Sequence, residues 1–455
     1  MPTAYTILFL LLILVAAATW IIPAGSYDYV DGVPVAGTYH TVEQNPQGVG
    51  DVLKAAFSGF YDAVDVCIFI LMVGGFLGVV MKTGAVDAGV GNVIRLLGGR
   101  EKWLIPILML LFGLGGTTYG MWEETMAFYP LLIPVFLAAG YDAVVGISVI
   151  LLGAGAGVIA STVNPFATGI AAGFAGVSLG EGIVLRLLEW VAFEAAAIWF
   201  VMAYAAKVKK NPSKSVVGVG AGKIQVSMDQ QVPFTAKRKV IMALFTLTFL
   251  IMVYAVVPFD EMGLPLPVLG WWFPELSALF LVSGVIIGLI DRQREDEIAD
   301  TFVAGCADLL GVALIIGISR GITVLMNDGA ITDTVLHWGE QALSGAGAIS
   351  FTLLVFALYL PLTILIPSSS GLATLSIPIV APLGKFAGVG GDLVVTAFQS
   401  ASGLVNIITP TAAVVMGALA LGHVPYDRWV KYVWKLILWF LLLALAFLVA
   451  GVLLG

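Results

Sequence analysis

The sequence predicts an all-α polytopic membrane protein built as an inverted-topology repeat, with two re-entrant hairpins and two unwound membrane helices. Three observations lead to this fold class. First, 60% of the 455 residues are hydrophobic and only 11% are charged, whereas soluble domains carry about 25% charged residues. Second, the apolar runs are long and continuous, which favours helices over a β-barrel. Third, one order of features occurs twice along the chain.

The distribution of Lys and Arg predicts the orientation of the chain in the membrane. The segments 25–50, 258–275 and 327–347 contain no Lys or Arg. The remaining loops hold a basic set: Arg95, Arg100, Lys102, the Lys-rich stretch 207–239, Arg292, Arg294, Arg428, Lys431 and Lys435. By the positive-inside rule the basic set is cytoplasmic, which places the N-terminus in the cytoplasm.

The elements follow in order from these charges. We expect a first membrane helix at 3–23, within a segment 1–50 that ends in an external loop. No charged region precedes this helix, so it is not expected to be a cleaved signal. Two repeats follow, at 51–206 and 295–455. They are separated by a basic cytoplasmic linker at 207–239 and by two scaffold helices in 240–294.

Each repeat is expected to contain a hairpin and then a broken helix. The hairpins lie at about 103–139 and 349–386, and the broken helices at about 142–177 and 392–420. Polar tips mark the hairpins, E-E-T at 123–125 and S-S-S-G at 368–371. The charge rule gives the two repeats opposite orientations. Inverted repeats of this kind are typical of secondary transporters.

The two predicted helix breaks carry residues that suit a cation. Non-helical backbone inside a membrane is tolerated only where protein or a water-filled cavity satisfies it. Pro165 and Pro410 interrupt the two helices, and the freed carbonyl groups with nearby side-chain oxygens suit Na⁺. The expected cation-binding residues are Ser161, Thr162, Asn164, Thr168, Ser402, Asn406, Thr409 and Thr411. The alternative is that these residues only pack helices together.

Glu123 and Glu124 stand out because carboxyl groups inside a membrane are energetically expensive and usually functional. Adjacent acids resist being ionised together, so one proton shared by them would suit proton coupling. Two ionised acids would instead suit a cationic substrate. A third possibility is a shallow tip facing the cytoplasm. Arg320 is the only basic residue well inside a predicted span, where it binds a substrate carboxylate or forms a structural salt bridge.

Two further acids, Glu189 and Glu194, lie five residues apart on the predicted helix 183–206 and are expected to be structural, with Arg186 nearby. Aromatic residues beside the first tip favour an organic cation, although such residues also simply pack. The predicted substrate-binding residues are Tyr119, Trp122, Glu123, Glu124, Thr125, Asn164, Arg320, Ser368, Ser369, Ser370, Gly371 and Asn406.

Four motifs resemble a known family over nearly the whole chain. They are G-G-T-T-Y-G-M-W-E-E-T-M-A-F-Y-P-L-L-I-P-V, S-R-G-I-T-V-L-M-N-D-G-A-I, S-S-S-G-L-A-T-L-S-I-P-I-V-A-P-L and S-G-L-V-N-I-I-T-P-T. These motifs resemble the YfcC-like branch of the anaerobic four-carbon-dicarboxylate carrier (DcuC) family, in the ion transporter superfamily. The resemblance implies a homodimer in a bacterial or archaeal inner membrane, with a scaffold domain and a transport domain that moves by an elevator mechanism.

The resemblance leaves the substrate open. The family name implies a dicarboxylate, but a dianion beside two acids would be repelled unless a proton or Na⁺ intervened. The branch is also similar to arginine/ornithine exchangers, and one Arg with two acids suits a basic amino acid, which we favour. Na⁺ symport, H⁺ symport and exchange all remain possible.

Other functional classes lack support in the sequence. We find no basic patch for nucleic acid, no His cluster for a metal and no Walker-type motif. The three His residues are scattered, and Cys67 and Cys306 lie in apolar runs without ligand spacing. We therefore expect no enzyme activity and no cofactor beyond a coupling Na⁺ or H⁺. The expected partners are a small-molecule substrate and the lipid bilayer, and a channel is the less favoured alternative.

Overall fold

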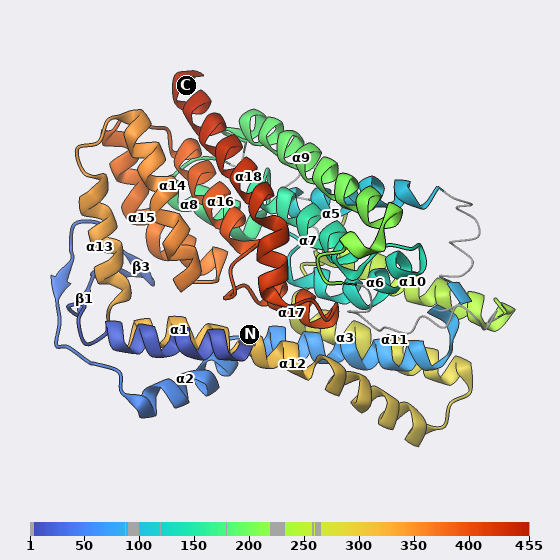
Figure 1. The fold of residues 1–455 in the computed structure, drawn as a ribbon. Helices are drawn as coiled ribbons and strands as arrows, with labels where there is room; N and C mark the ends of the chain where they lie inside the picture. Colours follow the sequence, from blue (N-terminus) through green and yellow to red (C-terminus); the bar gives the residue numbers. More distant parts are fainter. Residues whose placement is uncertain are drawn as a thin grey trace.

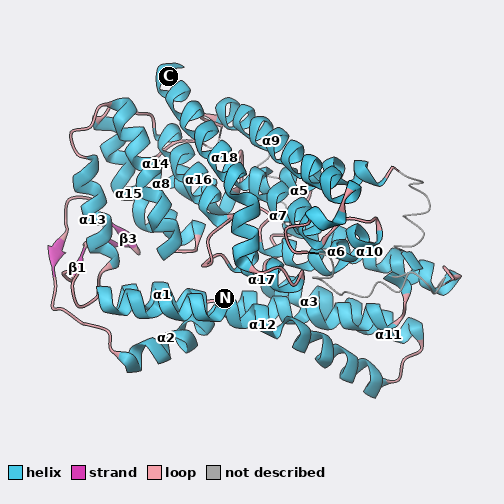
Figure 2. Ribbon diagram, viewed as in Figure 1, coloured by secondary structure: helices cyan, strands magenta, loops and turns pink. Residues whose placement is uncertain are grey.

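The computed structural model describes residues 4–86, 88–89, 100–118, 120–178, 180–218, 233–256, 259 and 265–454 (Figure 1). Helices make up most of this part of the chain, as predicted (Figure 2). The strands described are two residues long and form two antiparallel pairs. β1 (Gly25–Ser26) pairs with β4 (His40–Thr41), and β2 (Tyr29–Val30) pairs with β3 (Val33–Pro34).

One group of helices, here called the first layer, lies along the lower part of Figure 1. Helix α12 packs along α1, α2 and α3, while α11 packs on α3 and α10 on α11. Close approach is possible because glycines face each other, and a Cβ on Gly74 would lie 2.5 Å from the carbonyl oxygen of Gly305. The members are α1 (Ala4–Ala18), α2 (Val49–Asp62), α3 (Val64–Lys82), α10 (Ala236–Val256), α11 (Phe273–Asp291) and α12 (Glu295–Asp328).

The second layer lies above the first in Figure 1 and contains the regions of both predicted hairpins. Helix α7 packs against α5, α9 and α16, and α14 packs against α16. From the first half of the chain the members are η1 (Glu101–Trp103), α5 (Leu104–Thr118), η2 (Glu123–Phe128), α6 (Tyr129–Ala138), α7 (Ala143–Ile159), η3 (Pro165–Gly169), α8 (Ile170–Ala175), α9 (Ile183–Lys210) and η4 (Pro212–Lys214). From the second half they are α13 (Thr332–Leu343), α14 (Ala348–Leu365), α15 (Ser369–Phe386), α16 (Gly391–Asn406), α17 (Ala413–Leu421) and α18 (Tyr426–Leu454).

Helical structure is interrupted at both places where the sequence carries a proline after a polar run. Helix α7 ends at Ile159 and a π-helical turn begins only at Pro165. Helix α16 ends at Asn406 and α17 begins at Ala413, with Pro410 between them. Neither helix continues through its proline, which lacks a backbone N–H and clashes with the preceding turn. Proline alone does not decide this, because α14 continues through Pro361 and α15 through Pro378 and Pro382.

One expected boundary is absent. We expect an amphipathic stretch at 295–305 followed by a separate helix at 306–325, but α12 runs without a break from Glu295 to Asp328. The sequence between these two parts contains no proline, and Gly305 packs tightly against α3. Nothing at this point disrupts the helical hydrogen bonds.

Several helices meet the length and hydropathy of a membrane span. Among the described residues these are α3, α11, α12, α14 and α18, and two shorter apolar helices cover Tyr5–Ala18 and Ala143–Ile159. The chain is therefore a multi-pass membrane protein. Some predicted features lie outside the described residues: Arg95, Tyr119, residues 219–232 of the basic linker, and residues 257–258 and 260–264.

Candidate functional site

A cavity of about 130 Å³ lies between the two layers. The first layer contributes Val66 of α3, Trp272 and Phe273 of α11, and Arg320 of α12. The second layer contributes Gly120, Trp122, Glu123, Glu124, Val158, Asn164, Ala167, Ser368, Ser369, Ser370 and Asn406. The cavity thus brings together both predicted hairpin tips and both helix interruptions.

A smaller cavity of about 50 Å³ shares several of these walls. Glu123, Arg320 and Asn406 line both cavities, and Ser319 and Thr411 line only the smaller one. The shared residues place a basic group of the first layer and an acidic group of the second in one site. The two cavities together therefore form a polar site with both basic and acidic side chains.

The first tip is a short 3₁₀ turn that fixes its carboxyl groups. Glu124 is 5% exposed, and its carboxylate accepts a hydrogen bond of 3.1 Å from the backbone N–H of Trp122. The hydroxyl of Thr125 donates to the carbonyl oxygen of Trp122 at 2.5 Å. Glu123 is partly exposed and faces both cavities. The turn thus holds one acid within the protein and presents the other to the site.

The arm that carries this tip is tied to the first helix break. The hydroxyl of Thr117, at the end of α5, donates to the carbonyl oxygen of Ala160 at 2.8 Å. In return, the backbone N–H and the hydroxyl of Thr162 donate to the carbonyl oxygen of Thr117 at 2.8 and 2.9 Å. These bonds satisfy backbone groups that the broken helix leaves free, which the interior requires.

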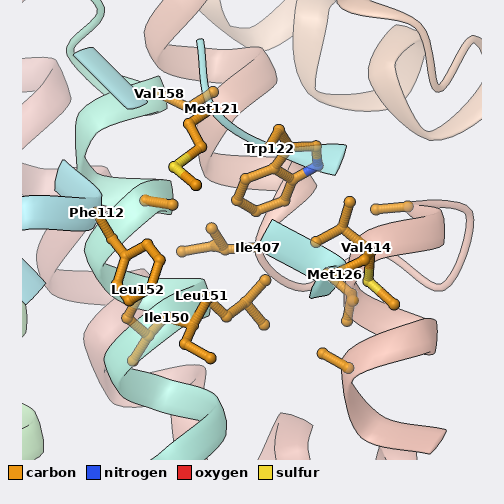
Figure 3. Packing of buried hydrophobic residues seen from close by; sticks show 14 of the residues in the cluster. Phe112, Met121, Trp122, Met126, Ile150, Leu151, Leu152, Val158, Ile407 and Val414 are labelled. Atoms are coloured by element: carbon orange, nitrogen blue, oxygen red, sulfur yellow. The ribbon is translucent and has the colours of Figure 1, made fainter. Parts of the chain in front are cut away.

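The indole of Trp122 closes the apolar side of the site. Figure 3 shows it beside Ile407, Met126 and Val414. Ile407 comes from the second helix break, and both side chains pack against Gly155 of α7, where an added Cβ would lie 2.5 Å from Ile407 and 3.6 Å from Trp122. The first tip is thereby held against both interrupted helices by apolar packing.

The second tip is the N-terminus of α15. Ser368 is the N-cap, and its hydroxyl oxygen accepts a hydrogen bond of 3.2 Å from the backbone N–H of Gly371. Ser368, Ser369 and Ser370 line the larger cavity. A helix N-terminus carries free N–H groups and a partial positive charge, so this tip favours an anionic group.

Arg320 lies opposite the acids and is only weakly paired. Its Nε is 3.8 Å from the carboxylate of Asp62 at the end of α2, and its side chain is 25% exposed. An ion pair at this distance, with a half-exposed carboxylate, contributes little free energy. The guanidinium of Arg320 therefore has donor capacity left for a ligand in the cavity.

The predicted cation-binding residues differ in how their oxygens are satisfied. The hydroxyls of Thr409 and Thr411 are hydrogen-bonded to each other at 2.8 Å. Asn164 accepts a long bond of 3.4 Å from the backbone N–H of Ala167. By contrast, buried hydroxyl oxygens without a hydrogen-bond partner in the described chain occur at three members of the predicted set: Ser161, Thr168 and Ser402.

Ser161 lies in the first break and Thr168 in the π-helical turn that follows it, whereas Ser402 lies on α16. A Cβ on Gly403 would lie 2.6 Å from Cα of Ile159, so the turn of α16 that carries Ser402 packs directly on the end of α7. A buried hydroxyl without a partner destabilises the fold by about 1–3 kcal/mol.

Most of the predicted substrate-binding residues line the larger cavity, but not all of them do. Thr125 and Gly371 hold the tips and do not line either cavity, and Tyr119 lies outside the described residues. The site also has walls that the sequence analysis missed, namely Val66, Trp272 and Phe273. The aromatic run W-W-F-P at 271–274, in a loop without Lys or Arg, is the signal that could have indicated the last two.

Gly120 provides a direct test of the tip geometry. Its φ is +77°, and an added Cβ would lie 2.5 Å from the side chain of Asn164. We expect Gly120→Ala to lower the free energy of unfolding by more than the 1–3 kcal/mol that φ strain alone contributes, and to impair transport. The measurement is thermal unfolding together with transport in proteoliposomes.

The matched control for this variant is Gly140→Ala. Gly140 has a similar φ of +84°, but an added Cβ would meet nothing within 4 Å. This control therefore carries the backbone strain without the clash. Equal effects of the two variants would mean that the contact between Gly120 and Asn164 is not important.

An enclosed site of both charges between two helical layers, lined by interrupted helices, defines the class of membrane transporters. The chain belongs to the DcuC family, whose family model is described as "C4-dicarboxylate anaerobic carrier" and matches residues 1–453. As a member of a carrier family, the chain is a transporter and not an enzyme.

The relatives support the same placement. The chain is 36% identical to an uncharacterized protein of Haemophilus influenzae, covering 99% of this chain and 97% of that protein. It is 31% identical to YfcC of Escherichia coli, provisionally named a basic amino acid antiporter, covering 95% of this chain and 92% of YfcC. These identities also confirm the YfcC-like resemblance seen in the motifs.

Two solved transporter structures are distantly similar. The YdaH transporter of Alcanivorax borkumensis has 14% identity and a TM-score of 0.45, with 98% of each chain covered. MtrF of Neisseria gonorrhoeae, described as one of a class of antimetabolite efflux pumps, has 16% identity and a TM-score of 0.44, with 98% of this chain and 94% of MtrF covered.

Proposed function

We propose that this protein is a secondary active transporter of a small charged organic solute, with a basic amino acid such as arginine or ornithine favoured. The observation that carries the proposal is the cavity between the layers, where Glu123 and Glu124 lie on one wall and Arg320 on the other. A basic amino acid carries one carboxylate and two cationic groups, which matches one Arg and two acids.

The chemistry of the walls supports this match. The planar guanidinium of Arg320 suits the α-carboxylate, because it can donate two parallel hydrogen bonds. Glu123 faces the cavity and suits a cationic group, and Trp122 and Trp272 add aromatic surface that attracts organic cations. The provisional name of YfcC, basic amino acid antiporter, agrees with this assignment.

A four-carbon dicarboxylate is the second candidate. The N-terminus of α15, with Ser368, Ser369 and Ser370, adjoins the same cavity as Arg320, and both favour an anion. The family description also mentions a dicarboxylate. This substrate would require Glu123 and Glu124 to be neutralised by a proton or by Na⁺, since two bare carboxylates would repel it.

Movement of the solute is proposed to be coupled to a cation or to counter-exchange. The unpartnered hydroxyls of Ser161, Thr168 and Ser402 support a Na⁺ site at the crossing of α7 and α16. H⁺ symport, Na⁺ symport and antiport are the three forms that this coupling can take.

The transport step is proposed to follow an elevator mechanism within an inverted-topology repeat. The first layer would be the scaffold domain and the second the transport domain. The position of the cavity between them supports this division, because a relative movement of the layers would change which side the site faces. We further propose a homodimer in the inner membrane with a cytoplasmic N-terminus, the orientation that the basic loops favour.

The experiment that tests the substrate class is thermal stabilisation of the purified full-length protein. The panel holds arginine, ornithine, lysine, neutral amino acids, succinate, fumarate and citrate, each with Na⁺ or K⁺. A ligand that binds only the folded state at one hundred times its Kd stabilises it by about 2.7 kcal/mol. We expect a clear shift with arginine or ornithine.

The other outcomes discriminate among the alternatives. A shift with succinate or fumarate that requires Na⁺ would favour the dicarboxylate candidate. Counterflow of labelled arginine in proteoliposomes then separates a carrier from a channel, because only a carrier is stimulated by unlabelled substrate on the opposite side. A flux that rises linearly with concentration and lacks counterflow would contradict the transporter assignment at this site.

A further inference from the structure

A second buried acid lies outside the substrate cavity and has no partner. Glu194 of α9 is 2% exposed, and within the described chain neither carboxyl oxygen has a hydrogen-bond partner. The group lies against Gly113 of α5, where an added Cβ would overlap Oε2 and lie 2.9 Å from Cδ of Glu194. The absence of a side chain at Gly113 is what makes room for this carboxyl.

The elements packed against α9 offer Glu194 no counter-charge. Neither α5 nor α7 contains an ionisable side chain within its bounds. Helix α18 presents Phe440 to the neighbouring Phe193, with their ring centroids 4.7 Å apart. On α9 itself, Arg186 and Glu189 precede Glu194, and Lys207, Lys209 and Lys210 lie in the last turn. Asp392 of α16 lies near Arg186, and Asp142, Tyr204 and Tyr432 lie together toward the other end of α9. The remaining titratable groups of α18 all precede Phe440: Tyr426, Asp427, Arg428, Lys431 and Lys435.

Glu189, on the same helix, provides the contrast. One of its oxygens accepts a hydrogen bond of 2.9 Å from the hydroxyl of Ser400, and Arg186 lies close enough to interact with its charge. The other oxygen of Glu189, Oε2, has no hydrogen-bond partner in the described chain, so Glu189 is satisfied through one oxygen and Glu194 through neither. The structural role expected for both acids therefore leaves Glu194 unexplained.

A proton is the simplest partner for Glu194 in this position. An ionised carboxylate without partners in the interior carries a penalty of several kcal/mol. A cation bound at Glu194 would need several further oxygen ligands, and the facing helices α5 and α7 contain no acidic side chain to supply one. A proton neutralises the carboxyl group and needs no additional space between Glu194 and Gly113.

We propose that Glu194 is a proton-binding site of the transport cycle, protonated while α5 packs on α9 and deprotonated when α5 moves away. On release, the carboxyl O–H bond breaks and water accepts the proton, which leaves a carboxylate that must then be hydrated. Hydration requires α5 to separate from α9 at Gly113. This inference rests on the proposed transport function and names H⁺ as a coupling ion.

Helix α5 connects Glu194 to the substrate cavity. The same helix ends at Thr118, and Thr117 is bonded to Thr162 in the first break. The tip with Glu123 and Glu124 follows directly. A displacement of α5 that hydrates Glu194 therefore also displaces the tip that contacts the substrate cavity.

The first test is independent of the substrate. Infrared difference spectra of the full-length protein in lipid bilayers, recorded between acidic and alkaline pH, reveal the C=O stretch of protonated carboxyl groups. We expect one such band to change with pH in the native protein and to be lost in Glu194→Gln, which has nearly the same shape. Glu189→Gln, the matched control on the same helix, is expected to retain it.

The second test measures coupling in proteoliposomes that contain a pH-sensitive dye. In the native protein, added arginine is expected to drive proton movement across the membrane. In Glu194→Gln this proton movement is lost, while exchange of labelled arginine for unlabelled arginine persists. Size-exclusion profiles and thermal unfolding of the variants verify that each one folds.

The outcomes separate the two proposals. An infrared spectrum that is the same in native protein and Glu194→Gln, or native-like proton movement in that variant, would overturn the assignment of Glu194. Failure of the native protein to transport arginine would instead overturn the substrate proposal. The pH-dependent band would still assign the proton to Glu194, and the coupling test would be repeated with the other solutes of the panel.

Discussion

Glutamine at Glu124 or Glu123 is expected to impair transport much more than it impairs folding. Glutamine keeps the volume of the side chain, and at Glu124 its amide oxygen can still accept the N–H of Trp122. The negative charge is lost, however, and a hydrogen bond to a charged group contributes about 1.5–3 kcal/mol. This corresponds to about ten- to one-hundred-fold weaker binding of a cationic substrate. Transport in proteoliposomes and thermal stabilisation by arginine measure the effect.

Glu43→Gln serves as the matched control, because Glu43 is exposed in the segment between β4 and α2, far in sequence from the residues that line the cavity. This variant is expected to behave like the native protein. The two site variants should also differ from each other. Glu124 holds the turn as well as a charge, so its variant should lose some stability, whereas Glu123 mainly faces the cavity. Native-like transport in both site variants would refute the role of the carboxylates.

Removal of an unpartnered hydroxyl is expected to weaken cation dependence without destabilising the protein. In Ser402→Ala and Thr168→Val no hydrogen bond of the described chain is lost, because neither hydroxyl has a partner there. The free energy of unfolding should remain unchanged or rise, since an unsatisfied buried polar group is removed. The Na⁺ concentration for half-maximal transport should rise about tenfold, which corresponds to about 1.4 kcal/mol of binding free energy.

The control for the hydroxyl variants is Ser148→Ala, also on a helix of the second layer. The hydroxyl of Ser148 donates to the carbonyl oxygen of Val144 and lies 3.2 Å from that of Tyr432. This variant should lose about 1 kcal/mol of stability and keep its cation dependence, the reverse of the expected pattern. If Ser402→Ala and Thr168→Val instead lose stability with unchanged Na⁺ dependence, these hydroxyls pack helices and bind no ion.

Sequence patterns were sufficient to predict the local elements and the chemical character of the tips. Continuous apolar runs indicate helices because burial of the chain in lipid demands internal backbone hydrogen bonds. Proline marks the interruptions at Pro165 and Pro410 because its missing N–H acts locally. The acids at Glu123 and Glu124 stand out for the same reason, since their rarity in an apolar chain is visible without coordinates.

The boundary of α12 shows where such patterns fail. An amphipathic start and an apolar continuation suggest two elements, yet the helix is continuous across Gly305. The hydropathy pattern indicates which side of a helix faces lipid, water or protein. It does not indicate where the helix ends. Only a residue that disrupts the backbone hydrogen bonds, or packing that does so, produces an end.

By itself the sequence determined the membrane class, the order of helices and breaks, and which residues have the chemistry for a site. The tertiary structure decided which of them meet. Arg320 and Glu123 line one cavity, and Trp272 and Phe273 join it from the start of α11. Glu194 rests on Gly113 without a hydrogen-bond partner in the described chain. These relations depend on how separate helices pack, and packing is set by side-chain contacts between segments far apart in the chain.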